Sequence, residues 1–241
     1  MDVPFEPTGA PSNGPQTNAI VWTFAALATS FLGLRVVCKY RKHNHLWWDD
    51  WLLVASWFLM IAACSLVSVN VAAGFGKHDK DVDPREFDGL GMRNMIVGSM
   101  LNLSAAWSKT SFAVSLLRIA TPRLRIVIWL LIVSMNILMH AGVVIGWVAC
   151  HPVEKFWKYN IEGECWPAKI TLPISIFINV YSGCMDLVLA LLSWCIIIKL
   201  HMNLREKIGI AMAMSMGVFA GVTAIVKGVG LTVLDGHDYN C

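Results

Sequence analysis

Charged residues are scarce in this chain of 241 amino acids: they make up 15% of it, against 56% for hydrophobic residues. A soluble domain usually carries about a quarter of its residues as Asp, Glu, Lys or Arg. The formal net charge of +3 is also small, so we expect no nucleic-acid partner. The shortage of charge predicts a protein that resides in the lipid bilayer.

No cleavable signal peptide is expected in the first residues. Residues 1–18 are rich in Pro and Gly and contain neither a basic start nor an apolar run. We predict that residues 1–18 form a disordered extracellular tail and that residues 19–241 form a transmembrane helical bundle.

Long apolar stretches recur six times along the chain. A helix needs about 20 mostly apolar residues to span a bilayer, and long continuous segments of this kind are helices. The six expected spans are Ala19–Val37, Trp51–Ala73, Met95–Leu117, Ile126–Ala149, Ile170–Ile198 and Ile208–Leu234. The sequence therefore predicts an all-α, polytopic membrane protein.

The basic residues between these stretches favour an N-terminus outside the cell, because Lys and Arg are enriched in cytoplasmic loops. With that orientation ten basic residues lie on the inner side and seven on the outer side. The inner set is Arg35, Lys39, Arg41, Lys42, Arg118, Arg123, Arg125, Lys199, Arg205 and Lys207. The outer set is Lys77, Lys80, Arg85, Arg93, Lys155, Lys158 and Lys169.

Two of the seven cysteines, Cys150 and Cys165, flank one loop that this topology places outside. An oxidising compartment permits a disulfide there, and a bridge closing a loop of this size contributes on the order of 3 kcal/mol. We predict a Cys150–Cys165 disulfide; the alternative is two free thiols near the membrane surface.

Asp49 and Asp50 stand among three tryptophans at the start of the second apolar stretch. A carboxylate there can accept from free backbone N–H groups and favours the helix dipole. We therefore interpret the pair as helix-capping residues at the inner membrane interface, partly offset by Arg41 and Lys42. The neighbouring Trp48 and Trp51 fit an interfacial aromatic belt. A cytosolic partner or a metal role is the alternative, although the DDxxD spacing of diphosphate-binding metal sites is not met.

Five short sequence segments resemble motifs of the fungal rhodopsin-like integral membrane proteins. They are "WWDDWLLVAS", "GFGKH", "WSKTSFAVSLLRI", "CHPVEKFW" followed by "GEC", and "NVYSGCMDLVLALLSW". The resemblance covers residues 19–241 and implies a seven-helix, receptor-like bundle, of which this chain is expected to lack helix 7. Some members are described as sensors of surfaces or extracellular cues, and others occur in secondary-metabolite gene clusters.

Lys109 and Asp186 are opposite charges inside apolar stretches, at overlapping depths. A lone charge in mid-membrane costs roughly 2.5–3.5 kcal/mol, so the two side chains are expected to form an ion pair or to contact water. Other polar residues recur at helical spacing on the same stretches. They are Asn102 before Lys109, Asn136 with His140, and Asn179 before Asp186. We hypothesise that these residues line a common polar interior, either as a ligand site or switch, or as structural contacts between helices.

Neither a cofactor nor a metal is expected. A retinal Schiff base needs a lysine on the last helix, and the only lysines within the spans are Lys109 and Lys227. The acidic text "HDKDVD" has Pro84 and Leu90 where an EF-hand loop requires Gly and Glu.

The sequence favours a receptor-like sensor of an extracellular or lipophilic cue, not of light, in the plasma membrane. Its partners would be the bilayer and a cytosolic signalling protein at the basic inner loops. An enzyme is less favoured, but the alternative is a membrane-embedded, cyclase-like biosynthetic enzyme with Asp186 as acid and His140 assisting.

Overall fold

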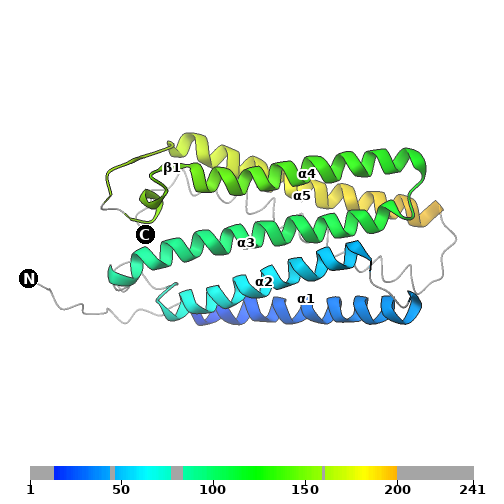
Figure 1. The fold of residues 1–241 in the computed structure, drawn as a ribbon, viewed down its shortest axis with the longest axis horizontal. Helices are drawn as coiled ribbons and strands as arrows, with labels where there is room; N and C mark the ends of the chain where they lie inside the picture. Colours follow the sequence, from blue (N-terminus) through cyan, green and yellow to red (C-terminus); the bar gives the residue numbers. More distant parts are fainter. Residues whose placement is uncertain (1–13, 44–46, 77–83, 159–160, 200–241) are drawn as a thin grey trace, which may run out of the picture. The chain divides into compact units, whose positions relative to one another are not determined.

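The computed structural model describes residues 14–43, 47–76, 84–158 and 161–199, which are helical apart from one small hairpin (Figure 1). The helices are α1 (Gly14–His43), α2 (Trp48–Ala72), α3 (Pro84–Leu117), α4 (Pro122–Val148) and α5 (Ala168–Lys199). Between α4 and α5 lie β1 (Cys150–His151), the short 3-10 turn η2 (Val153–Phe156) and β2 (Glu164–Cys165).

Four of the described helices are long and apolar enough to cross a bilayer: Gly14–Arg41, Trp48–Ala72, Pro122–Val148 and Lys169–Ile196. The protein is therefore a polytopic, all-helical membrane protein. The expected span Met95–Leu117 is present as helix within α3, but α3 is not one of the four, because Lys109, Asn102 and several serines lower its mean hydropathy. The expected sixth span, Ile208–Leu234, lies outside the described residues.

The chain divides into two compact units, and α3 contributes to both. Unit 1 comprises Met1–Ser108 and Gly146–Cys165, and unit 2 comprises Lys109–Ile145 and Trp166–Cys241. Residues up to Ser108 in α3 thus belong to unit 1, and residues from Lys109 belong to unit 2.

In unit 1, α1 and α2 lie side by side and are joined by polar contacts along their length (Figure 1). The Trp22 indole N–H donates to Ser68 Oγ at 2.8 Å, and the Trp57 indole N–H donates to Thr29 Oγ1 at 2.9 Å. Polar contacts hold helices together in lipid, where apolar side chains meet lipid tails as readily as each other. Helix α1 begins at Gly14, before the start of the expected span Ala19–Val37.

The chain leaves α2 through a turn that requires glycine. Gly74 and Gly76 have φ values of 107° and 87°, in the left-handed region that residues with a Cβ rarely adopt. The Phe75 N–H donates to the Asn70 carbonyl at 2.8 Å and closes the end of the helix. This geometry gives a physical reason for the two glycines of the text "GFGKH".

The hairpin between α4 and α5 docks on α3 within unit 1. Cys150 pairs with Cys165 in the β1–β2 ladder, and the two cysteines form the predicted disulfide. Trp157, just after η2, lies so close to α3 that a Cβ on Gly91 would be 2.7 Å from the Trp157 Cβ. The indole N–H of Trp147 at the end of α4 donates to Ser99 Oγ of α3 at 2.8 Å.

Unit 2 contains an apolar core built from three helices. Its buried members come from the end of α3 and the following turn, from α4 and from α5. They are Ala113, Leu116, Ala120, Ile128, Ile132, Leu189 and Ile196. This core fixes the last turns of α3 against α4 and α5, and so positions the polar residues of the same helices.

Candidate functional site

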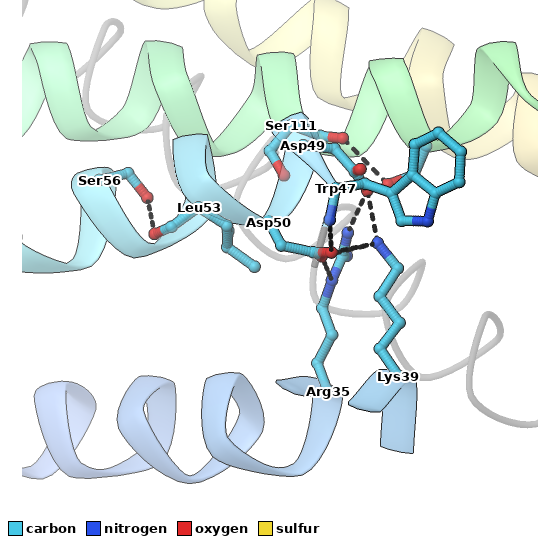
Figure 2. A network of polar contacts seen from close by, with 9 residues as sticks. Arg35, Lys39, Trp47, Asp49, Asp50, Leu53, Ser56 and Ser111 are labelled. Atoms are coloured by element: carbon cyan, nitrogen blue, oxygen red, sulfur yellow. Dashed lines mark hydrogen bonds and ion pairs between the residues drawn. The ribbon is translucent and has the colours of Figure 1, made fainter. Parts of the chain in front are cut away.

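A cluster of four charges joins the C-terminal part of α1 to the first turn of α2 (Figure 2). The Lys39 ammonium lies 2.7 Å from Asp49 Oδ2 and 2.6 Å from Asp50 Oδ1. One turn earlier on α1, the Arg35 guanidinium lies 3.5 Å from Asp49 Oδ2 and 3.7 Å from Asp50 Oδ1. Two positive and two negative charges meet here, so the cluster is formally neutral.

The two aspartates are almost completely buried, with exposed fractions of 1% and 2%. Burying a carboxylate is unfavourable unless its charge is compensated and its oxygens are hydrogen-bonded. Lys39 and Arg35 supply that compensation from α1, at i and i+4, which places both side chains on one face of the helix. The sequence prediction considered Arg41 and Lys42 as the compensating residues, whereas the observed ion pairs use Arg35 and Lys39.

Asp50 also makes a capping interaction. Trp47 is the N-cap residue of α2, and its backbone N–H donates to Asp50 Oδ2 at 3.2 Å. Asp50 is therefore at the third helical position, where an acidic side chain can reach back to the N-cap N–H. Trp48 and Trp51 are 86% and 63% exposed, so neither covers the charge cluster.

A second charged contact links α3 to α5 within unit 2. The Lys109 ammonium lies 2.9 Å from Asp186 Oδ2. It also donates to the hydroxyl of Ser182 at 2.5 Å and to the Ser182 carbonyl at 3.2 Å. These three acceptors match the three N–H groups of a lysine, so the ammonium is fully hydrogen-bonded. The pairing of Lys109 with Asp186 predicted from the sequence is thus present in the structure.

Of the other residues expected in a polar interior, some contact a neighbouring helix and some bond only within their own helix. Asn136 of α4 donates to the Thr110 hydroxyl at 2.8 Å, so it does contact the residue next to Lys109. His140 is exposed, and its Nδ1 contacts the Asn136 carbonyl at 2.8 Å, within its own helix. The structure therefore brings Asn136, but not His140, onto the α3 surface beside Lys109.

Asn102 and Asn179 also satisfy their side chains within their own helices. Asn102 is exposed and donates to the Gly98 carbonyl, and Asn179 donates to the Ser175 carbonyl. An amide that bonds to the carbonyl four residues back needs no partner from another helix. Helical spacing alone did not reveal this local alternative.

The described residues contain no group of three or more His, Cys, Asp or Glu that could hold a metal ion. The acidic text at residues 78–83, the GxxxG at Gly217–Gly221 and Lys227 lie outside the described residues. The carboxylate oxygens of Asp49 and Asp50 face Lys39 and Arg35.

Sequence reasoning did not assign three residues to these contacts: Arg35, Lys39 and Thr110. A signal was available for the first two, because basic residues four apart near the end of one apolar helix face the acidic start of the next. Thr110 had none, since a hydroxyl inside an apolar stretch usually bonds to its own helix backbone.

Comparison with known proteins decides the family. The sequence matches the fungal rhodopsin domain over residues 34–239, which includes both charged contacts. The chain belongs to the fungal rhodopsin domain family. It is also 22% identical over 211 residues to the wortmanamides biosynthesis cluster protein C of Talaromyces wortmannii. That match covers 85% of this chain and 57% of the relative's length, so this family member spans less than two thirds of that relative. No solved structure matches the chain.

Proposed function

We propose that this fungal rhodopsin domain protein is a receptor-like membrane sensor that responds to an extracellular or lipophilic cue. The observation that carries the proposal is the Lys109–Asp186 ion pair, which joins α3 to α5. Charged side chains inside a membrane-spanning chain are costly, and they commonly mark substrate pathways, ligand contacts or switches. A cue that competes for either charge favours a state in which the two helices are no longer tied together.

The proposal includes a seven-helix topology with the N-terminus outside. The family match extends to residue 239 and so supports residues 208–234 as a sixth span. The disulfide between Cys150 and Cys165 supports the orientation, because an oxidising compartment then contains the α4–α5 hairpin. Residence in the plasma membrane, and a cytosolic signalling partner at the basic inner loops, complete the proposal.

A response to light is not part of the proposal. A retinal Schiff base consumes the lysine amine, and all three N–H groups of the Lys109 ammonium are engaged by Ser182 and Asp186.

The experiment compares a deletion strain, complemented with wild-type or variant protein, for growth responses to surface contact and to added lipophilic compounds. Lys109→Met is expected to reach the membrane in reduced amount and to lose most of the response per molecule. The control Lys158→Met removes a half-buried lysine whose ion pair with Glu154 lies in the hairpin loop. A Lys109→Met protein with a normal response per molecule contradicts the sensor proposal.

A membrane-embedded biosynthetic enzyme remains the second candidate, and the name of the relative from a biosynthesis cluster favours it. In that mechanism Asp186 protonates a lipophilic substrate and His140 assists. The geometry supports this mechanism less well, because Asp186 is ion-paired as a carboxylate and His140 bonds within its own helix. Metabolite profiling of the deletion strain separates the two functions, since loss of a cyclised product with intact growth responses supports the enzyme.

A further inference from the structure

The turn between α3 and α4 carries three positive charges and no acidic residue. Arg118 follows the end of α3, and Arg123 and Arg125 lie in the first turn of α4. All three arginines are exposed. The charged contacts described above do not include these three arginines, which concentrate positive charge within residues 118–125.

The backbone of this turn is held by a buried side chain and by hydrogen bonds. Ala120 is buried in the core of unit 2, and its N–H donates to the Leu116 carbonyl at 3.0 Å. The Arg125 N–H donates to the Thr121 carbonyl at 2.9 Å, and Arg125 Nε donates to the Ala120 carbonyl at 3.3 Å. Arg125 thus folds back over the turn and keeps its guanidinium beside it.

An exposed apolar face of α4 begins directly after the arginines. Its large side chains are spaced by four, three and four residues, which places them on one side of the helix. They are Ile126, Leu130, Val133 and Ile137, with exposed fractions of 67%, 67%, 48% and 63%. The same helix, Pro122–Val148, is long and apolar enough to span a bilayer, so this face lies at acyl-chain depth and the turn at headgroup depth.

We propose that the α3–α4 turn and this face of α4 form a binding site for one anionic phospholipid. The lipid phosphate engages the guanidinium groups of Arg123 and Arg125, with Arg118 adding to the positive field, and an acyl chain lies along Ile126–Ile137. Guanidinium groups bind phosphate through paired, charge-assisted hydrogen bonds. Clusters of basic residues next to a span attract anionic lipid, which is abundant in the cytoplasmic leaflet. The three arginines directly adjoin the exposed apolar face of α4. This arrangement favours a lipid over a soluble protein, because a soluble protein would not contact the membrane-embedded face of a helix.

The test is native mass spectrometry of the whole protein, delipidated in detergent and titrated with phosphatidic acid or with phosphatidylcholine of identical acyl chains. Wild-type protein is expected to bind one phosphatidic acid at least tenfold more tightly than phosphatidylcholine. Arg118→Gln/Arg123→Gln/Arg125→Gln should abolish this preference. The matched control Lys158→Gln/Lys169→Gln removes two positive charges elsewhere in the protein and should retain the preference for phosphatidic acid. Equal affinity of wild-type protein for the two lipids overturns the proposal whether or not the triple variant folds.

Two further arms separate the lipid from other anions and from a protein partner. Glycerol phosphate carries the headgroup chemistry without acyl chains, and it should bind at least tenfold more weakly than phosphatidic acid. Ile126→Ser/Leu130→Ser should weaken phosphatidic acid binding severalfold and leave binding of glycerol phosphate unchanged. If glycerol phosphate binds as tightly as the lipid, the site recognises a soluble anion and the lipid proposal is wrong. If the arginine variant keeps its lipid but loses a co-purifying cytosolic protein, the turn is a protein interface instead.

Discussion

Lys39 Nζ of α1 lies 2.7 Å from Asp49 Oδ2 of α2, and the same ammonium nitrogen contacts both oxygens of Asp50. One lysine therefore bridges two buried carboxylates at the start of a membrane helix. The contact adds to the Trp22–Ser68 and Trp57–Thr29 hydrogen bonds that also join α1 to α2.

Removal of the Lys39 charge should destabilise the protein strongly. In Lys39→Met the two buried carboxylates lose their closest cation and keep the longer ion pairs with Arg35, and breaking a buried ion pair on one side costs about 3 kcal/mol or more. Thermal unfolding in detergent measures the loss. The control Arg41→Met changes an exposed residue of the same helix and should leave the unfolding temperature nearly unchanged.

Neutralisation of the aspartates should rescue much of that loss. In Asp49→Asn/Asp50→Asn/Lys39→Met no uncompensated carboxylate remains, and an amide oxygen at position 50 can still accept from the Trp47 N–H. We expect the triple variant to unfold at a higher temperature than Lys39→Met alone. A triple variant less stable than the single one would show that the carboxylates have an essential role beyond pairing with Lys39.

The close approach of the hairpin to α3 should depend on Gly91. Gly91→Ala places a Cβ 2.7 Å from the Trp157 Cβ, so Trp157 or the helix must move, and stability should fall by about 1–3 kcal/mol. Gly98→Ala in the same helix meets nothing within 4 Å and should be neutral or slightly stabilising. Thermal unfolding of the two variants side by side gives the comparison, and equal effects contradict the docking of Trp157.

The disulfide should be detectable directly. Peptide mapping without reductant should yield one fragment containing both Cys150 and Cys165, which separates into two after reduction. Cys150→Ser/Cys165→Ser should lower stability by about 2–4 kcal/mol, because the loop gains freedom in the unfolded chain. Recovery of both thiols unmodified from native membranes would contradict the bridge.

Much of this fold follows from the sequence because lipid restricts the backbone to few solutions. The apolar stretches beginning near Ala19, Trp51, Ile126 and Ile170 all correspond to helices long enough to span. For the segment Met95–Leu117, mean hydropathy does not identify a membrane span. Helix α3 carries polar side chains whose partners belong to other helices, and these side chains lower the mean hydropathy of the helix. The disulfide was predictable because two cysteines flank one loop, which the ladder of β1 and β2 brings together.

The candidate site was only partly predictable, for a physical reason. Lys109 and Asp186 have no oppositely charged partner nearby on their own helices. Because an unpaired charge in an apolar helix is unfavourable, the sequence predicts that the two pair with each other. Asn102 and His140 are polar groups that can bond to their own helix, so the sequence could not tell an interhelical contact from a local one. The partners of Asp49 and Asp50 depend on which face of α1 packs on α2, which periodicity in α1 did not reveal.

Charge reversal across the Lys109–Asp186 pair tests the sensor proposal most directly, with unfolding temperature and response to the cue measured on the same proteins. Lys109→Asp and Asp186→Lys should each lower the unfolding temperature, and the double variant should recover a large part of it. The account predicts that the recovered protein still responds poorly, because the cue competes for a specific charge at each position. A double variant no more stable than either single variant contradicts direct pairing, and one that regains both stability and full response contradicts the proposed role in sensing.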